Sequence, residues 1–292
     1  MRFLEVALER ALGKPRVSVH RAAVVAGGCI HQARHLTTSE GEFFAKWNAG
    51  GPDDIFLSEA RGFEALRSAA SEILVPRVIA AAKSSGGAPA FLILEYLEPA
   101  SRGQAPDDES LGRGLAAIHR TGTEKFGFDS ATYCGLTRQD NRWRDSWVEF
   151  FRDQRLQPLV DGLSRERGLP ASDLRLYERL MSRLKDLLPK DARPSLIHGD
   201  LWSGNVLSCA KGLALVDPAC AHADREMEFG ITTLFGGLSA RALEAYQEAW
   251  PLAAGWKDRN PLYQLYHLLN HAALFGGHYA EDARRIALRY VG

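Results

Sequence analysis

The motif His-Gly-Asp-Leu-Trp-Ser-Gly-Asn at residues 198–205 constrains this chain more than any other part of its sequence. A second motif, Ala-Leu-Val-Asp, follows at 214–217. The apolar segments between the two motifs are interrupted by a Lys-Gly step, which predicts a short hairpin. The chain therefore turns back on itself, and we expect Asp200, Asn205 and Asp217 to lie close together.

These three side chains match the requirements of phosphoryl transfer. Asp200, with an ordinary pKa of about 3.9, is a carboxylate at neutral pH and can accept the proton of an attacking hydroxyl. Asn205 and Asp217 offer hard oxygen ligands, which suit Mg²⁺. The D-x-x-x-x-N spacing matches the catalytic loop of protein kinases, in which a metal-binding aspartate follows later in the chain. The motifs therefore predict an ATP-dependent kinase with Asp200 as the base and Asn205 and Asp217 as ligands of Mg²⁺.

A lysine and a glutamate upstream fit the nucleotide side of such a site. Lys46 ends the segment Phe-Phe-Ala-Lys of a predicted strand, where a protein kinase places the lysine that contacts the ATP phosphates. Glu59 follows in a predicted helix and is the expected ion-pair partner of this lysine. Arg61 and Glu64 lie in the same predicted helix and leave the identity of the helix partner open.

Two further segments complete the predicted nucleotide site. Gly27 and Gly28 are expected to form a turn whose backbone N–H groups can approach phosphates closely, although the chain has no G-x-G-x-x-G there. Glu95, Tyr96 and Leu97 close the fifth predicted strand. In the kinase arrangement this position joins the two lobes, and its backbone groups hydrogen-bond the adenine. We therefore assign all five residues to ATP binding.

The composition is that of an ordinary globular protein and excludes several other classes. Of the 292 residues, 46% are hydrophobic and 25% are charged, and a chain of this length can form one large domain or two lobes. Basic and acidic residues both number 36, so no net field favours nucleic acid or an anionic membrane. No segment approaches the roughly 18 apolar residues of a membrane span, and acids interrupt the first ten residues as they would not in a secretory signal. We expect a cytoplasmic enzyme.

The predicted elements place strands first and helices afterwards. In the first part, strands are expected at 16–25, 33–38, 42–47, 75–82 and 90–97, with helices at 3–12 and 55–68. After a polar segment at 101–110, helices are expected at 111–120, 143–160, 173–188, 227–250 and 261–290, with a short strand at 195–197. This order favours an α+β, two-lobed, protein-kinase-like fold. Residues 1–97 would form a five-stranded antiparallel sheet with one main helix, and residues 98–292 a larger, mainly helical lobe.

The sequence Leu-Trp-Ser-Gly-Asn at 201–205 makes the resemblance to a known family specific. Together with Trp-Val-Glu-Phe-Phe at 147–151 and Leu-Phe-Gly-Gly at 234–237, it resembles the fructosamine kinase family of fructosamine 3-kinases and ketosamine 3-kinases. The resemblance runs from about Gly27 to the end of the chain. It implies ATP- and Mg²⁺-dependent phosphorylation of the 3-hydroxyl of a ketoamine. The phosphorylated adduct is unstable and releases its amine, so the implied role is repair of early glycation products.

By this resemblance, residues near the base belong to the acceptor side of the site. The indole of Trp202 could pack on the apolar face of a sugar or amine, and a core-filling role is equally open. His198 is assigned to the same side, where we expect it to brace the loop rather than carry protons. Asp224 and Glu228 are expected to stabilise the catalytic region through hydrogen bonds, and His119 is expected to have a structural role.

Two other functions fit the same motifs. One is a kinase for another small hydroxylated amine, such as an aminoglycoside or a choline-like compound. The other is a non-catalytic, ATP-binding pseudokinase, which fits less well because Lys46, Asp200, Asn205 and Asp217 are all retained. For a ketoamine acceptor, the motifs leave open whether the sugar is fructose, ribulose or erythrulose, and whether the adduct is free or protein-bound.

The four cysteines, Cys29, Cys134, Cys209 and Cys220, form no C-x-x-C pair and no Cys/His metal spacing. Cys29 directly follows the glycine pair, where phosphate-binding surroundings favour a thiolate and hence oxidation. We interpret Cys29 as a redox candidate whose disulfide to a second molecule would inhibit the enzyme reversibly, and the alternative is an inert buried thiol. The protein is accordingly expected to be a monomer or a redox-linked dimer.

Overall fold

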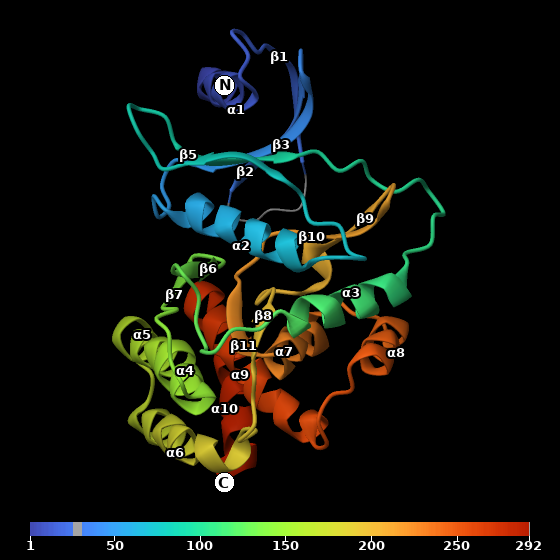
Figure 1. Ribbon diagram of the computed structural model, residues 1–292. Helices are drawn as coiled ribbons and strands as arrows, with labels where there is room; N and C mark the ends of the chain where they lie inside the picture. Colours follow the sequence, from blue (N-terminus) through green and yellow to red (C-terminus); the bar gives the residue numbers. More distant parts are fainter. Residues whose placement is uncertain (26–30, 292) are drawn as a thin grey trace.

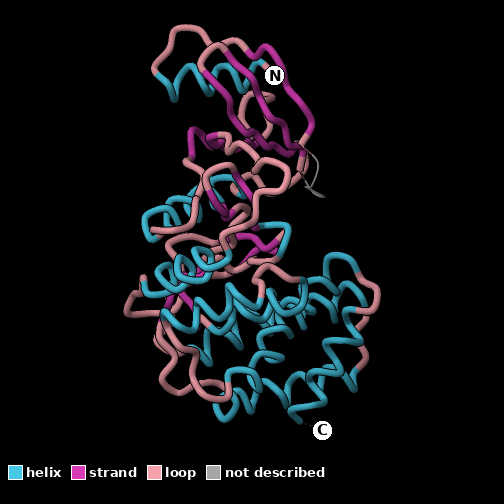
Figure 2. The backbone as a smooth tube through the Cα atoms, turned by 90° about the vertical axis from the view of Figure 1, so that its right-hand side faces the viewer, coloured by secondary structure: helices cyan, strands magenta, loops and turns pink. Residues whose placement is uncertain are grey.

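The computed structural model describes residues 1–25 and 31–291. The predicted nucleotide-site residues Gly27 and Gly28 and the redox candidate Cys29 lie outside the described residues. A sheet-rich lobe and a larger helical lobe stack one above the other (Figure 1). Seen from the side, most strands gather in the upper half beside the helix near the N-terminus, and most helices lie in the lower half (Figure 2). The predicted α+β, two-lobed fold is confirmed.

The first lobe is built on a five-stranded sheet in the order β1-β2-β3-β5-β4, with every neighbouring pair antiparallel. Its strands are β1 (Val19–Val24), β2 (Gln32–Thr38), β3 (Gly41–Asn48), β4 (Val78–Ala82) and β5 (Ala90–Glu95). Helix α1 (Arg2–Leu12) covers one face, and α2 (Ile55–Ala69) lies against the other (Figure 1). Central β3 carries Lys46, whose register partner on β5 is Leu92.

The second lobe contains the remaining helices. They are α3 (Asp108–Arg120), α4 (Trp147–Phe151), a π-helical turn (Arg152–Leu156), α5 (Gln157–Arg167), α6 (Ala171–Leu187), α7 (Glu226–Phe235), α8 (Ala240–Ala249), α9 (Trp256–Phe275) and α10 (Tyr279–Val291). The helices expected at 227–250 and 261–290 are each divided into two, α7 with α8 and α9 with α10. Gly236 and Gly276 end α7 and α9 with positive φ angles of 74° and 69°, which L side chains rarely adopt. The π-helical turn lies within the helix expected at 143–160 and joins α4 to α5 without a break.

Three short two-stranded ladders surround the predicted catalytic segment. They are β6–β7 (Thr132–Cys134 with Thr137–Gln139), β8–β11 (Pro194–Ile197 with Ala221–Asp224) and β9–β10 (Val206–Cys209 with Gly212–Leu215). The β9–β10 hairpin and its Lys-Gly turn were expected, and so was β8. Strands β6, β7 and β11 were not predicted, because they have only three or four residues and lack the apolar runs that indicate β8, β9 and β10.

One apolar cluster crosses from the first lobe into the second. It joins Phe56 and Leu92 under the sheet to Leu115 of α3, Leu215 of β10 and Phe229 of α7. Burying this surface holds the sheet-rich lobe against the helical lobe on the α2 side. Among the residues that the structure describes, no helix has the length and apolar character needed to cross a membrane.

Close packing of α3 on α8 depends on a glycine. A methyl group at Gly112 would lie 2.1 Å from the carbonyl oxygen of Ala242, which is backbone and cannot turn aside. We expect Gly112→Ala to lower the free energy of unfolding by about 2 kcal/mol, because the two helices must separate. At Gly162 in α5 the same methyl group meets nothing within 4 Å, so Gly162→Ala should stabilise by up to about 1 kcal/mol. Thermal denaturation of both variants measures the two changes in stability, and equal shifts in Tm would contradict the prediction.

Candidate active site

The catalytic loop is held by a buried histidine. His198 is 0% exposed, and its Nε2 lies 2.9 Å from the carbonyl oxygen of Val216. Its Nδ1 accepts the backbone N–H of Asp200 at 3.3 Å, so Nε2 is the protonated nitrogen. Both ring nitrogens are thus used to join the two motifs. The geometry does not support the predicted substrate contact of His198 and supports the bracing role.

Gly199 and the buried Glu228 determine the backbone conformation of the catalytic loop. Gly199 has a φ of 81°, and a methyl group there would lie 2.3 Å from the carbonyl oxygen of Ala219. The carboxylate of Glu228 accepts the backbone N–H of His198 at 2.5 Å and that of Gly199 at 3.0 Å. Only glycine fits this approach, and the glutamate from α7 fixes the backbone immediately before Asp200.

Asp200 lies between two polar groups at the centre of the site. Its Oδ2 is 3.3 Å from the amide nitrogen of Asn205, which also donates to the Asp200 carbonyl oxygen at 2.8 Å. The thiol of Cys134 donates to Oδ1 at 3.6 Å. Burial, followed by the negative charge of Asp217, raises the pKa of Asp200 to about 7. The ordinary value assumed from the sequence was therefore too low, and Asp200 is a stronger base than expected.

Lys46 forms the predicted ion pair and a second one. Its Nζ is 2.6 Å from Glu59 of α2 and 2.8 Å from Oδ1 of Asp217. Although burial opposes the charged form, the two carboxylates raise the pKa of Lys46 above its ordinary value. Glu64 is exposed on α2, so the partner left open by the sequence is Glu59. One turn further along α2, Gly62 lets the helix approach Pro218, because a methyl group there would lie 3.1 Å from the proline ring.

Asp217 and Asn205 present oxygen atoms that fit a hard cation. Asp217 has a φ of 55°, the left-handed conformation that aspartate tolerates better than most side chains. Its side chain is about half exposed, and only Oδ1 is engaged by Lys46 among the contacts of the described residues. Asn205 uses its amide nitrogen toward Asp200, which leaves its amide oxygen for a ligand. The donor set is therefore of the type that Mg²⁺ prefers.

The Trp-Ser-Gly and Leu-Phe-Gly-Gly segments pack directly on each other. The hydroxyl of Ser203 donates to the carbonyl oxygen of Phe235 at 3.0 Å. A methyl group at Gly237 would lie 2.8 Å from the Leu201 carbonyl oxygen, and one at Gly204 would meet the ring of Trp202 at 2.3 Å. The indole thus folds over the turn, and the Trp202 side chain is 38% exposed beside the base. The two segments therefore pack together immediately after Asp200 in the chain.

The predicted adenine segment ends β5 as expected. The carboxylate of Glu95 accepts the backbone N–H of Arg77 at 2.8 Å. The ring of Tyr96 stacks on His35 of β2, with ring centres 3.7 Å apart. Leu97 follows in the connection to the second lobe. The side chains of Glu95 and Tyr96 are therefore engaged by the protein itself, and the backbone N–H of Glu95 also donates within the protein, to the carbonyl oxygen of Arg77 at 2.9 Å.

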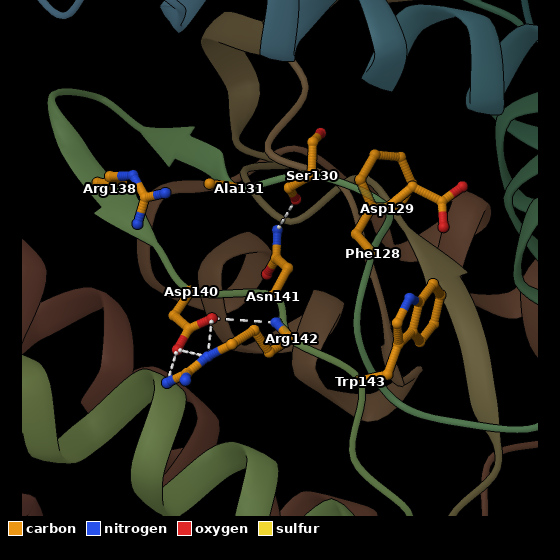
Figure 3. A pocket seen from close by; sticks show the side chains of 9 residues that line it. All are labelled: Phe128, Asp129, Ser130, Ala131, Arg138, Asp140, Asn141, Arg142 and Trp143. Atoms are coloured by element: carbon orange, nitrogen blue, oxygen red, sulfur yellow. Dashed lines mark hydrogen bonds and ion pairs between the residues drawn. The ribbon is translucent and has the colours of Figure 1, made fainter.

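A hollow of about 470 Å³ lies apart from these residues, and Figure 3 shows its lining. It is bounded by Phe128, Asp129, Ser130, Ala131, Arg138, Asp140, Asn141, Arg142 and Trp143. It includes none of the predicted site residues. Its residue Asn141 accepts a hydrogen bond from buried Arg155 at 2.6 Å and donates to Thr132 of β6 at 2.8 Å. This wall of the hollow supports the strand that carries Cys134.

Three residues around the base were not predicted from the sequence. Cys134 of β6 and His267 of α9 lie next to Asp200, and Asn270 of α9 contacts Cys134. The chain separates these residues widely, and none belongs to a spacing that indicates a site. Only the folded arrangement shows that they meet.

The fold and the site define a phosphotransferase of the protein-kinase-like class. An aminoglycoside phosphotransferase APH(4)-Ia, solved in a ternary complex with AMP-PNP and hygromycin B, shares this fold with a TM-score of 0.63 at 18% identity, over 99% of each chain. A crystal structure described as a fructosamine-3-kinase of Thermobifida fusca YX-ER1 aligns with a TM-score of 0.84 at 31% identity, again over 99% of each chain.

Sequence comparison narrows the class further. The family model for fructosamine kinase matches residues 4–291. A protein of Vibrio parahaemolyticus named a probable ketoamine kinase is 37% identical over 262 residues, which cover 89% of this chain and 88% of the relative. A protein of Synechocystis with the same name is 36% identical over 283 residues, covering 96% of this chain and 92% of the relative. The chain belongs to the fructosamine kinase family.

Proposed function

We propose that this enzyme transfers the γ-phosphoryl group of ATP to the 3-hydroxyl of a ketoamine. The observation that carries the proposal is the meeting of Asp200, Asn205, Asp217 and Lys46 at one site in a chain of the fructosamine kinase family. The product is an unstable sugar–amine adduct that releases its amine. The role is therefore repair of early glycation products.

Different residues of the chain have separate roles in this reaction. Asp200 accepts the proton of the attacking hydroxyl, and its raised pKa suits that task at neutral pH. Lys46, held by Glu59, meets the phosphates as a fixed positive charge. Trp202 presents its exposed indole to the acceptor. The backbone of residues 95–97 receives the adenine, and the boundary between the two lobes follows Leu97.

Asn205 and Asp217 would hold Mg²⁺ with the nucleotide. When bound, the ion supplies positive charge that neutralises the transferring group. The remaining work belongs to the chain, because phosphoryl transfer depends chiefly on positioning. The loop supplies that positioning through His198 and Glu228, which fix the backbone beside Asp200.

The choice of acceptor is tested by measuring ADP release with purified protein. We expect turnover with ribulosyl-lysine or fructosyl-lysine at least about tenfold above that with an aminoglycoside or choline, since an acceptor that misplaces its hydroxyl loses rate steeply. Free and protein-bound adducts are compared in the same assay. Turnover with the aminoglycoside or choline alone would make the enzyme a kinase of another small amine. ATP binding without turnover of any acceptor would favour the pseudokinase.

The redox role of Cys29 stays a prediction. It rests on the place of this cysteine after the glycine pair of the sequence. Unchanged peroxide sensitivity of a Cys29→Ser variant would remove it, together with the redox-linked dimer.

A further inference from the structure

Three side chains with different metal-binding chemistry meet at the base. Cys134, Asp200 and His267 each offer a ligand atom within 4.8 Å of the other two. The sulfur of Cys134 is 3.6 Å from Oδ1 of Asp200. A tetrahedral ion with a sulfur bond of about 2.3 Å and an oxygen bond of about 2.1 Å separates these ligands by nearly that distance. The sulfur of Cys134 and this oxygen of Asp200 are therefore already spaced as two ligands of one ion, and the ligand atom of His267 lies within 4.8 Å of both.

The residues around the cluster favour metal binding by His267 and Cys134. Within the described residues, Nδ1 of His267 is buried without a hydrogen-bond partner. Burial lowers the pKa of His267 to about 3, so its imidazole is neutral, which is the form that binds metals. The amide nitrogen of Asn270 donates to the sulfur of Cys134 at 3.3 Å. Such an outer contact orients and stabilises a thiolate ligand.

A divalent ion balances the charge of this cluster. Burial and the carboxylate of Asp200 raise the pKa of Cys134, so the thiol carries its proton before an ion binds. As the metal–sulfur bond forms, that proton passes to solvent. One thiolate and one carboxylate then neutralise the two charges of the ion. The ion and its two anionic ligands are therefore neutral together, so the complex places no net positive charge beside Arg155, the buried cation whose field reaches Cys134 and His267.

We propose that Cys134, Asp200 and His267 form a binding site for Zn²⁺ or a similar thiophilic divalent ion, and that occupancy inhibits the enzyme reversibly. Zn²⁺ accepts sulfur, nitrogen and oxygen ligands together, whereas Mg²⁺ takes oxygen ligands almost alone. The inhibitory ion thus uses other ligands than Asn205 and Asp217, and it engages the carboxylate that the acceptor hydroxyl needs. Excess Mg²⁺ does not displace it.

Optical titration with Co²⁺ tests the site without any assay of activity. Nucleotide-free, full-length protein is titrated with Co²⁺, which adopts Zn²⁺ geometries and absorbs when bound to a thiolate. We expect a near-ultraviolet sulfur-to-cobalt band that saturates at one equivalent and disappears when one equivalent of Zn²⁺ is added. The absence of a thiolate band in the reduced wild-type protein would overturn the proposal.

Variants identify the ligands. We expect Cys134→Ser to lose the band and His267→Gln to weaken Co²⁺ binding at least tenfold. Asp200→Asn, which keeps the size of the side chain, should retain the band but bind Co²⁺ more weakly. Its weaker binding therefore tests the site even if Cys134→Ser does not fold. The matched controls Cys209→Ser and His271→Gln should leave the titration unchanged. A band that survives in folded Cys134→Ser would overturn the proposal.

A second experiment concerns inhibition and rests on the proposed function. At constant excess MgATP, we expect Zn²⁺ to raise the apparent KM for the ketoamine, and a chelator to restore the rate. Persistent inhibition of folded Cys134→Ser at the same Zn²⁺ concentration would show that the ion acts elsewhere and would overturn the inhibitory role. If no ketoamine is turned over, the proposed function fails, and the Co²⁺ titration still decides whether the metal site exists.

Discussion

Asp200→Asn is expected to reduce kcat by about 10²–10⁴-fold, the usual contribution of a positioned general base. Asparagine preserves the size of the side chain and can still accept the hydrogen bond from Cys134. It cannot take up the proton of the acceptor hydroxyl. Lys46 and its partner Glu59 do not contact the Asp200 side chain in the described structure, so nucleotide affinity should stay nearly unchanged. Steady-state ADP release and calorimetric titration with AMP-PNP measure the two quantities.

A matched substitution separates catalysis from a general loss of charge. Asp191 is exposed in the turn before β8, so Asp191→Asn should retain wild-type kcat and AMP-PNP affinity. Activity of Asp200→Asn within about threefold of wild type would remove Asp200 as the base, because general-base catalysis is worth far more. Loss of both turnover and AMP-PNP binding would instead indicate that the variant is misfolded, which thermal denaturation would reveal.

Local sequence patterns predicted most of the fold because its main elements are long and strongly patterned. The central strands β3 and β5 are rich in aromatic and branched residues, and α2 repeats its apolar residues with a helical period. The breaks after α7 and α9 were missed because glycine pairs also occur within helices, and tertiary contacts decide which pairs end one. The apolar cluster that joins Phe56 to Phe229 was also invisible, since no local pattern specifies which helix meets which.

The site shows the same division between local and distant information. Asp200, Asn205 and Asp217 are close along the chain, and one hairpin brings them together as predicted. Their surroundings come from distant segments, and those surroundings set the chemistry. Burial raises the pKa of Asp200 to about 7, which no motif reveals. The burial of His198 is a further example, because sequence does not distinguish a histidine facing a cleft from one wholly enclosed beneath it.

Glu228→Gln is expected to lower kcat by about 10²-fold and the free energy of unfolding by about 2–5 kcal/mol. Hydrogen bonds from His119 and from the backbone of His198 act against the effect of burial, and the pKa of Glu228 lies below its ordinary value, so the carboxylate is ionised. Its two oxygens accept the backbone N–H groups of His198 and Gly199. Glutamine would place its own N–H₂ against one of these donors. The loop must then shift and carry Asp200 away from the acceptor hydroxyl.

Glu226→Gln provides the comparison that isolates this effect. Glu226 lies in the same helix and is also buried, but it pairs with Arg259 at 2.6 Å rather than with the catalytic loop. Its substitution should cost stability and leave kcat within about threefold of wild type while the protein is folded, since it moves no backbone beside Asp200. Equal losses of kcat in the two variants, measured well below both melting temperatures, would show that α7 supports the fold in general. A loss confined to Glu228→Gln would show that its carboxylate positions the base through the backbone amides of the loop.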